Sequence, residues 1–130
     1  MVDASALAAF ILKEESWEEL ARYLRRCVSV DHVVKEVANA IWRAFYLRKR
    51  MSLDEARHAL RLLLKLVERN VEIYPEIRYL EKAFAISAEY GITVYDALYI
   101  ALAQNRNLPL LTLDEKQRCV AKTLGIAVLP

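Results

Sequence analysis

The sequence contains few of the residues that break helices or build long loops. Its 130 residues include only 2 glycines and 3 prolines. Because these two residues mark most turns and chain breaks, their scarcity argues against a loop-rich architecture. We therefore expect many helices joined by short connections.

Cysteine and histidine are also scarce. Cys27 and Cys119 lie far apart and form no C-x-x-C pair, and His32 and His58 stand at no ligand spacing. This arrangement argues against a structural zinc site. We expect both thiols to be buried.

Long apolar runs are absent as well. None approaches the roughly 20 residues that span a membrane. No signal peptide is recognisable, because Asp3 comes too early and Lys13, Glu14 and Glu15 interrupt the apolar segment that follows it. We expect a cytoplasmic protein with no membrane partner.

The charges of the chain nearly balance. Its 19 basic and 17 acidic residues leave a net charge of +2, so any binding of nucleic acid must come from a local arrangement of cations. With 56% hydrophobic and 28% charged residues, the chain has the composition of a folded protein. Its length fits one domain over residues 1–130.

Short apolar segments alternate with amphipathic helical patterns along the chain. Helices are expected over residues 4–12, 16–26, 31–50, 52–70, 76–90, 93–105 and 115–124, and strands over 27–30, 71–74, 108–114 and 126–129. This alternation predicts an α/β fold with a central parallel sheet of four to five short strands flanked by helices, in three layers α/β/α.

Several residues are expected to begin or end these helices. Two S-x-x-E pairs predict capping boxes, and single residues are expected as N-caps or as glycine stops. The boxes are Ser16 with Glu19 and Ser52 with Glu55, the N-caps are Asp31 and Thr93, and the stops are Gly91 and Gly125.

Four acids fall near one edge of the predicted sheet. Here the very short apolar segment before Asp3 counts as the first strand, and residues 27–30 as the second. Asp3 follows the first strand and Asp114 follows the fourth. Asp96 lies in the first turn of its helix, and Glu36 lies one turn into the helix after the second strand. The carboxyl edge of a parallel sheet is where α/β proteins place a ligand crevice. We therefore expect these four side chains to face one crevice.

Four carboxylates in one crevice repel one another, by about 4 kcal/mol for a pair about 4 Å apart at an effective dielectric constant near 20. A fold tolerates this if a divalent cation lies between them or if some carboxyls hold protons. Oxygen ligands without His or Cys favour Mg²⁺ or Mn²⁺. Such a cation binds phosphate oxygens and activates water, so the pattern indicates cleavage of phosphodiesters.

Each acid also has an ordinary structural interpretation. Asp3 and Asp114 could cap the helices that follow them, Asp96 could pair with Thr93, and Glu36 could be a solvated helix residue. Capping and metal ligation are compatible, because a residue at a helix N-terminus can do both. The evidence for a site is the joint pattern.

Four motifs occur in a fixed order. They are D-x-S at residues 3–5, E-V-A-N at 36–39, T-V-Y-D-A-L-Y-I-A-L-A at 93–103 and L-P-L-L-T-L-D at 108–114. With this order and these gaps, the chain from Val2 to the closing G-I-A-V-L resembles the PIN-domain ribonucleases, and most of all the VapC toxins of VapBC toxin–antitoxin pairs. It departs from them in having few apolar residues before Asp3, so that the first strand is almost absent.

The resemblance implies a set of site residues. The catalytic and metal-binding residues would be Asp3, Glu36, Asp96 and Asp114. Ser5, Asn39 and Thr112 would support these carboxylates without binding the metal. The last three could equally be ordinary capping or helix-face residues. Asn39 would orient the carboxylate of Glu36.

The resemblance also implies an activity and partners. It implies a Mg²⁺- or Mn²⁺-dependent endoribonuclease in which a metal-activated water attacks phosphorus. It further implies a protein antitoxin that obstructs the site, and a homodimer.

Basic and aromatic residues outside the acidic motifs have two interpretations each. The cations are either RNA contacts or a solvated face, and the aromatic residues either line an antitoxin or dimer groove or pack in the core. The possible RNA contacts are Arg43, Arg48, Lys49 and Arg50, and the aromatic residues are Trp17, Trp42, Phe45 and Tyr46.

Three other functions compete with a toxin ribonuclease. The chain could be a PIN nuclease of RNA processing without an antitoxin, or a non-catalytic binding domain with the same fold. A phosphoacceptor receiver domain would want paired acids after the first strand and a lysine after the last, whereas Asp3 stands alone and the chain closes with A-V-L-P.

Overall fold

The strands of the molecule are short, and all of them run parallel. In the computed structural model, which describes all of residues 1–130, β1 (Cys27–Val30) pairs with β2 (Val71–Tyr74), and β3 (Leu110–Leu111) pairs with β4 (Val128–Leu129). The predicted parallel α/β fold is therefore confirmed. The strand expected over residues 108–114 is shorter than predicted, with only two residues in the ladder.

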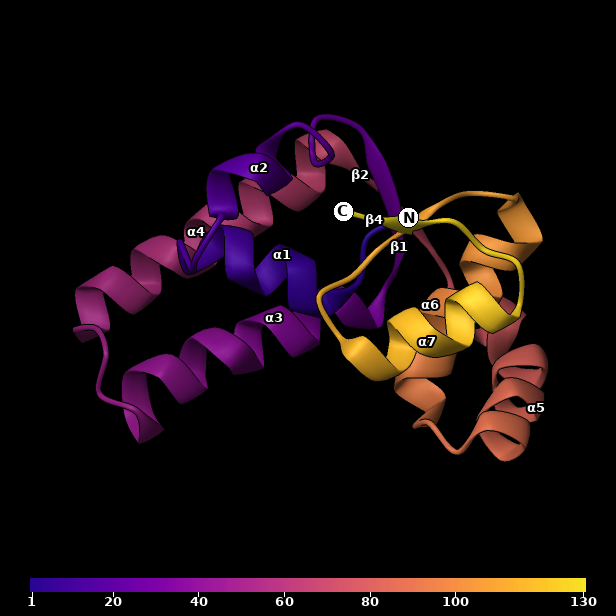
Figure 1. Cartoon of the computed structure of the whole chain (residues 1–130). Coiled ribbons are helices and arrows are strands. Elements are labelled where there is room, and N and C mark those ends of the chain that lie inside the picture. The colour runs from indigo at the N-terminus through magenta and orange to yellow at the C-terminus, as the bar shows by residue number, and fades with distance from the viewer.

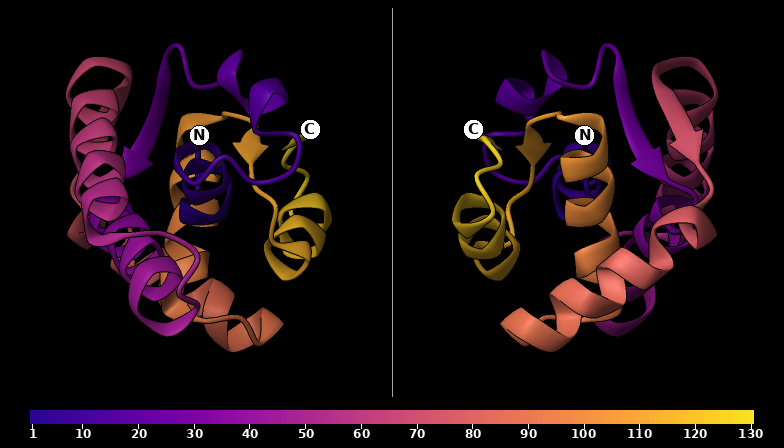
Figure 2. Two further views of the ribbon diagram at one scale, coloured as in Figure 1. Left: turned by 90° about the vertical axis from the view of Figure 1, so that its left-hand side faces the viewer. Right: turned by 90° about the vertical axis from the view of Figure 1, so that its right-hand side faces the viewer.

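Val2 joins the two pairs of strands into one sheet. Its backbone N–H donates to the carbonyl of Val28 at 2.9 Å, and it forms a parallel bridge with Leu111. The right-hand view of Figure 2 shows the resulting order, from β2 through β1 and the indigo N-terminal segment to β3 and the yellow C-terminal segment. The almost absent first strand is thus a single bridging residue at the centre of the sheet, and Val2 is fully buried there.

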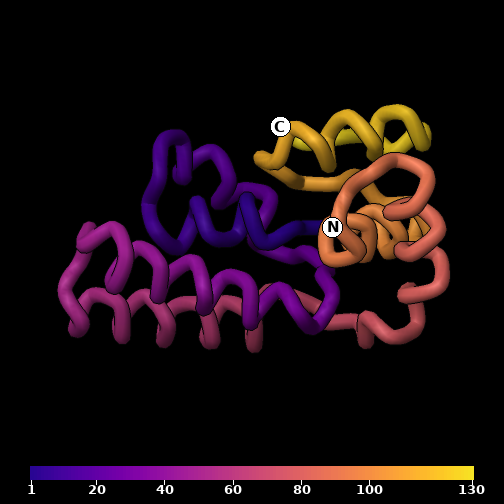
Figure 3. The backbone as a smooth tube through the Cα atoms, turned by 90° about the horizontal axis from the view of Figure 1, so that it is seen from below, coloured from indigo at the N-terminus to yellow at the C-terminus, as the bar shows by residue number.

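Helices lie on both sides of these strands (Figure 1). On one side are α1 (Ala4–Ile11), α2 (Trp17–Ala21), α3 (His32–Trp42), its π-helical continuation η1 (Arg43–Leu47) and α4 (Leu53–Asn70). On the other are the 3₁₀ turn η2 (Glu76–Tyr79), α5 (Leu80–Tyr90), α6 (Val94–Arg106) and α7 (Glu115–Thr123). Figure 3 shows α3 and α4 running side by side as a long antiparallel pair. No helix combines the length and the apolar character needed to cross a membrane.

The core includes one wholly buried stretch of α6. All residues from Ala97 to Ala103 are buried, so this helix is covered on every side and its N-terminal turn is held in a fixed place. That turn carries Asp96.

Two of the predicted helix starts form as expected. Ser52 and Glu55 make a reciprocal capping box, with bonds of 3.2 and 2.7 Å. Thr93 caps α6 by accepting from the backbone N–H of Asp96 at 3.1 Å.

Two other predicted starts are wrong. Ser16 has a left-handed φ of 63° and makes no capping bond, and the helix after it spans only Trp17–Ala21. Asp31 makes no capping bond to α3, because its carboxylate accepts instead from the backbone N–H of Glu76 at 3.1 Å. In the second case a partner distant in sequence outcompetes the local one.

The expectation that both thiols are buried is also wrong. Cys119 is exposed and Cys27 is half-buried. Cys119 lies on the outward face of α7, a helix that packs against its neighbours along one side only.

Candidate active site

Asp3 is a buried carboxylate held by three groups. It is fully buried and caps α1 by accepting from the backbone N–H of Ala6 at 3.0 Å. The hydroxyls of Ser5 and Thr112 donate to it at 2.8 and 2.6 Å. Burial raises the pKa of Asp3 to about 6 from an ordinary value of 3.8. The hydrogen bonds oppose this increase, and the negative charge of Asp114 adds to it.

Asp114 is tied to Asp3 through Thr112. Its backbone N–H donates to the Thr112 hydroxyl at 3.0 Å, and its carboxylate caps α7 by accepting from the backbone N–H of Gln117 at 2.8 Å. Both acids therefore lie at helix N-termini, where the helix dipole favours a negative charge.

Gln117 connects Asp114 to Asp96. Its side-chain amide donates to Asp96 Oδ1 at 3.0 Å, while Asp96 Oδ2 accepts from the hydroxyl of Thr93 at 2.7 Å. Gln117 is only 4% exposed, and its Oε1 has no hydrogen-bond partner. Sequence analysis missed this residue, although its place one turn after Asp114 was a signal for it.

Glu36 reaches the site by a different route. The hydroxyl of Tyr99, on α6, donates to Glu36 Oε2, and His32 Nε2 lies 3.2 Å from the same oxygen, off the line of a hydrogen bond. Burial alone would raise the pKa of Glu36, but the contacts with His32 and Tyr99 outweigh it and lower the pKa. Burial, together with the charges of Glu36, Asp3 and Asp96, raises the pKa of Tyr99. This phenol therefore lies among the acids and remains protonated.

Asn39 does not orient Glu36, contrary to expectation. It is exposed and forms no hydrogen bond with that carboxylate. Two buried side chains contact Glu36 Oε2 instead: Tyr99 donates to it and His32 Nε2 lies 3.2 Å away. Sequence analysis missed both residues, although the i, i+4 spacing of His32 and Glu36 was a signal for the first.

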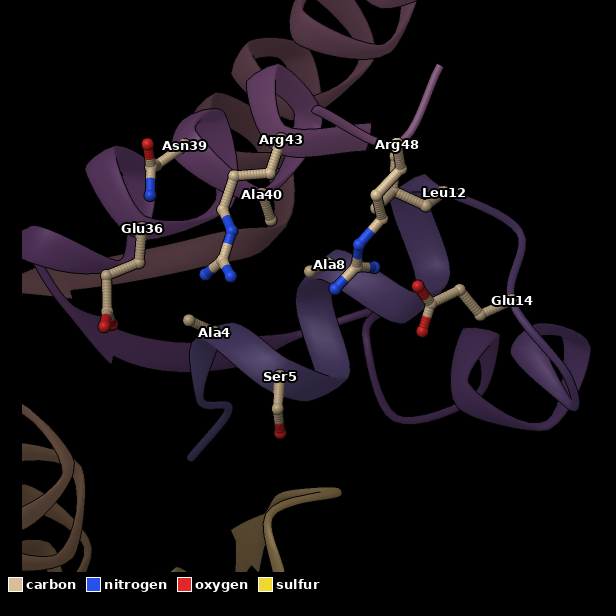
Figure 4. Close-up of a pocket in the computed structure, with 10 residues that line it drawn as sticks. All are labelled: Ala4, Ser5, Ala8, Leu12, Glu14, Glu36, Asn39, Ala40, Arg43 and Arg48. Atoms are coloured by element: carbon tan, nitrogen blue, oxygen red, sulfur yellow. The ribbon is translucent and has the colours of Figure 1, made fainter. Parts of the chain in front are cut away.

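A cavity of about 280 Å³ opens beside Glu36, between α1 and α3. Figure 4 shows its polar lining, in which Arg43 and Arg48 direct their guanidinium groups toward α1. Asn39 and Ser5 line the same cavity, whereas Lys49 and Arg50 do not. The basic segment at residues 43–50 thus divides into two arginines that line this cavity and two cations that do not.

The four acids come from four different elements. Thr112 and Gln117 link Asp3, Asp114 and Asp96 by hydrogen bonds, and Tyr99 bonds Glu36 to α6, the helix that carries Asp96. No three of the His, Cys, Asp and Glu side chains stand close enough to hold a metal ion as they lie. The donor set nevertheless fits a hard divalent cation, because it consists of carboxylate oxygens. The ionised form of buried Asp3 is disfavoured, and a cation would offset that cost.

Comparison with known proteins shows the family of the chain. Residues 1–123 match the PIN-domain family. The chain belongs to the PIN-domain family. This PIN domain is 38% identical to Ribonuclease VapC3 of Pyrobaculum aerophilum over 120 residues, which cover 89% of each protein. It is 33% identical to VapC ribonuclease Mb0985 of Mycobacterium bovis over 115 residues, covering 88% of this chain and 84% of that protein.

The crystal structure of PAE2754 from Pyrobaculum aerophilum has the same fold. It superposes with a TM-score of 0.71 and 25% identity, over 98% of this chain and 86% of the other. The resemblance to VapC-type PIN domains and the predicted α/β/α fold are therefore confirmed.

Proposed function

We propose that this PIN domain is the ribonuclease toxin of a toxin–antitoxin pair and cleaves RNA phosphodiesters internally with the help of Mg²⁺ or Mn²⁺. The observation that carries the proposal is Asp3, a fully buried carboxylate whose ionised form is disfavoured unless a cation lies beside it. The names of the relatives, which are ribonucleases of the VapC type, support RNA as the substrate.

In this proposal each acid has a role. Asp3, Asp96 and Asp114 would hold the cation, and Glu36 would hold a second cation or orient the attacking water. A divalent cation supplies the positive charge that activates water and neutralises the reacting phosphate. Ser5 and Thr112 keep the carboxylate of Asp3 in one orientation through their hydroxyl groups.

Arg43 and Arg48 would bind the RNA backbone. They line the same cavity as Glu36, so phosphates attracted to them would lie beside Glu36. A purely acidic site would repel RNA, and cations at its edge offset this repulsion. Lys49 and Arg50, which face elsewhere, would contribute less.

A protein antitoxin and a second copy of the chain are the proposed partners. Large apolar side chains are exposed along α3, η1 and α4, including Trp42 at 47% and Tyr46 at 59%. Leu53 and Leu60 line an adjoining apolar cavity of about 220 Å³ with Trp42. Such a surface is typical of a protein–protein contact. A PIN nuclease of RNA processing would share the site but would have no antitoxin to cover this surface.

The proposal is tested by incubating the protein with linear and circular RNA in Mn²⁺ or Mg²⁺, with EDTA as control. We expect metal-dependent cuts in both RNAs, because an endonuclease needs no free end. Asp3→Asn should abolish cleavage, while Asp54→Asn, at an exposed position on α4, should not. Cleavage that survives Asp3→Asn would contradict the proposal, and its absence from the wild-type protein under all conditions would favour a non-catalytic domain.

A further inference from the structure

His32 links Glu36 to a carboxylate outside the acidic site. It is the first residue of α3 and is only 2% exposed. Its Nδ1 lies 2.7 Å from Glu76 Oε2, and its Nε2 lies 3.2 Å from Glu36 Oε2. The ring is therefore held between two acids, one of which belongs to the proposed metal site.

Two tyrosines of α6 fix the plane of this imidazole. The rings of Tyr99 and Tyr95 meet it edge-on, with centroids 4.8 and 5.7 Å away. Tyr99 also donates to Glu36 Oε2, so this oxygen accepts a hydrogen bond from Tyr99 and lies beside His32 Nε2. The other oxygen of Glu36, Oε1, has no hydrogen-bond partner in the protein, and Glu36 lines the cavity. One oxygen is thus held and the other remains available.

The simplest alternative is that His32 only fastens η2 to the start of α3. That junction is already fastened without it, because Asp31 accepts from the backbone N–H of Glu76 at 3.1 Å and donates from its own N–H to Tyr74 at 3.2 Å. The contact of His32 with Glu36 contributes nothing to this junction.

We propose that His32, held in place by Glu76, is a positioning residue that orients the carboxylate of Glu36 toward the cation. This inference rests on the proposed function. It extends the site to Glu76, 40 residues beyond Glu36 in the sequence and on an element that carries no ligand. When a group that orients a metal ligand is removed, metal affinity or activity typically falls by about 10- to 100-fold.

Two substitutions test the roles of the two ring nitrogens of His32 separately. His32→Asn places an amide where Nδ1 lies and can still reach Glu76, whereas the longer His32→Gln places one where Nε2 lies and can donate to Glu36. We expect His32→Asn to weaken Mn²⁺ binding and to lower kcat by about 10-fold, with KM for RNA nearly unchanged. We expect His32→Gln to restore most of the Mn²⁺ affinity and most of the kcat. His58→Gln, at an exposed position on α4, is the control.

Mn²⁺ binding is measured without RNA, from the free-ion signal in electron paramagnetic resonance, and the melting temperature is recorded for each variant. Equal Mn²⁺ affinity and kcat in the wild-type protein and His32→Asn would overturn the inference, as would losses of equal size in the Asn and Gln variants. If the His32 variants do not fold, Glu76→Gln, whose side chain is one-third exposed, is measured in the same way. It should weaken Mn²⁺ binding by a few-fold, and wild-type affinity would overturn the inference.

These results distinguish this inference from the proposed function. A wild-type protein that binds Mn²⁺ but does not cut RNA would refute the ribonuclease, while the order of Mn²⁺ affinities among the variants would still test His32. Active wild-type protein with unaffected His32 variants would refute only the role of His32. A wild-type protein that binds no Mn²⁺ would overturn both.

Discussion

The two sides of the acidic site are built differently. Asp3, Asp96 and Asp114 lie at helix N-termini, and backbone N–H groups a few residues away help to hold Asp3 and Asp114. Glu36 lies inside α3 and is held only by side chains, from Tyr99 and His32. The side with Asp3, Asp96 and Asp114, here named the capping side, is organised mainly by local capping. The Glu36 side is organised by residues that are distant in the sequence and that the tertiary fold brings close.

Asp3 and Glu36 also respond oppositely to pH. The pKa of Asp3 is raised, so the stability associated with its neutral form is present at low pH and is lost as pH rises through about 6. The pKa of Glu36 is lowered, so its ionised form contributes stability at neutral pH that is lost as pH falls. Without a cation, ionised Asp3 thus costs stability, whereas ionised Glu36 contributes stability.

Asp3→Asn should have the largest effect and should separate function from stability. Cleavage should fall by at least about 100-fold, because a metal ligand is lost. The metal-free protein should become more stable at neutral pH, by up to about 3 kcal/mol, because the buried charge is gone. Urea unfolding in EDTA between about pH 4 and pH 8 measures this. A stability difference between wild type and variant that does not grow with pH would contradict the assigned cost of Asp3.

Tyr99→Phe should lower the stability of the protein, whereas Asp3→Asn should raise it. It removes the hydroxyl that donates to Glu36, so stability at pH 7 should fall by about 1–2 kcal/mol. The pKa of Glu36 should rise, and cleavage should drop by about 10-fold. Tyr95→Phe is the matched control, since the Tyr95 hydroxyl is exposed and makes no hydrogen bond. Titration of Glu36 by carbon NMR would show the change, and an unmoved pKa would contradict it.

Gln117→Leu should weaken the capping side without destabilising the protein. It removes the amide that donates to Asp96, but it also removes a buried oxygen that has no partner. These effects on stability should nearly cancel, to within about 1 kcal/mol. Cleavage should still fall by several-fold, because Asp96 is no longer tied to Asp114. A loss of activity that simply follows a lowered melting temperature would argue against this role.

Arg43→Gln and Arg48→Gln should have the smallest effects, confined to RNA binding. Each should raise KM by a few-fold with kcat unchanged. Each should also reduce the slope of log affinity against log salt by about 0.7, the value for one cation on single-stranded nucleic acid. Lys49→Gln, which faces away from the cavity, should change the slope less. Equal slopes for all three variants would contradict the division of the basic segment.

The sequence predicted the capping side of the site better than the Glu36 side. Asp3, Thr93 and Asp114 could be recognised as caps because their partners lie three residues away. Tyr99 could not be connected to Glu36 in this way, because 63 residues separate them. The pairing exists only because the fold brings the first turns of α3 and α6 together.

The errors have the same physical origin. The capping carboxylate of Asp31 was diverted to Glu76, 45 residues away. His32 appeared to lack ligand spacing when compared with His58, whereas its partners are two glutamates on different elements. Local rules predict which groups need a partner, but they do not identify a distant partner that competes for them.

The bonds between the first residues and β3 determine when the acidic site can assemble during protein synthesis. The bond from Asp3 N–H to Leu111 and the bond from the Thr112 hydroxyl to the Asp3 carboxylate both join the first residues to a segment near the end of the chain. A nascent chain that has not yet released β3 from the ribosome therefore lacks the central bridge of its sheet and the support for its first acid. For the proposed ribonuclease, this delays assembly of the acidic site until β3 has been synthesised and has left the ribosome.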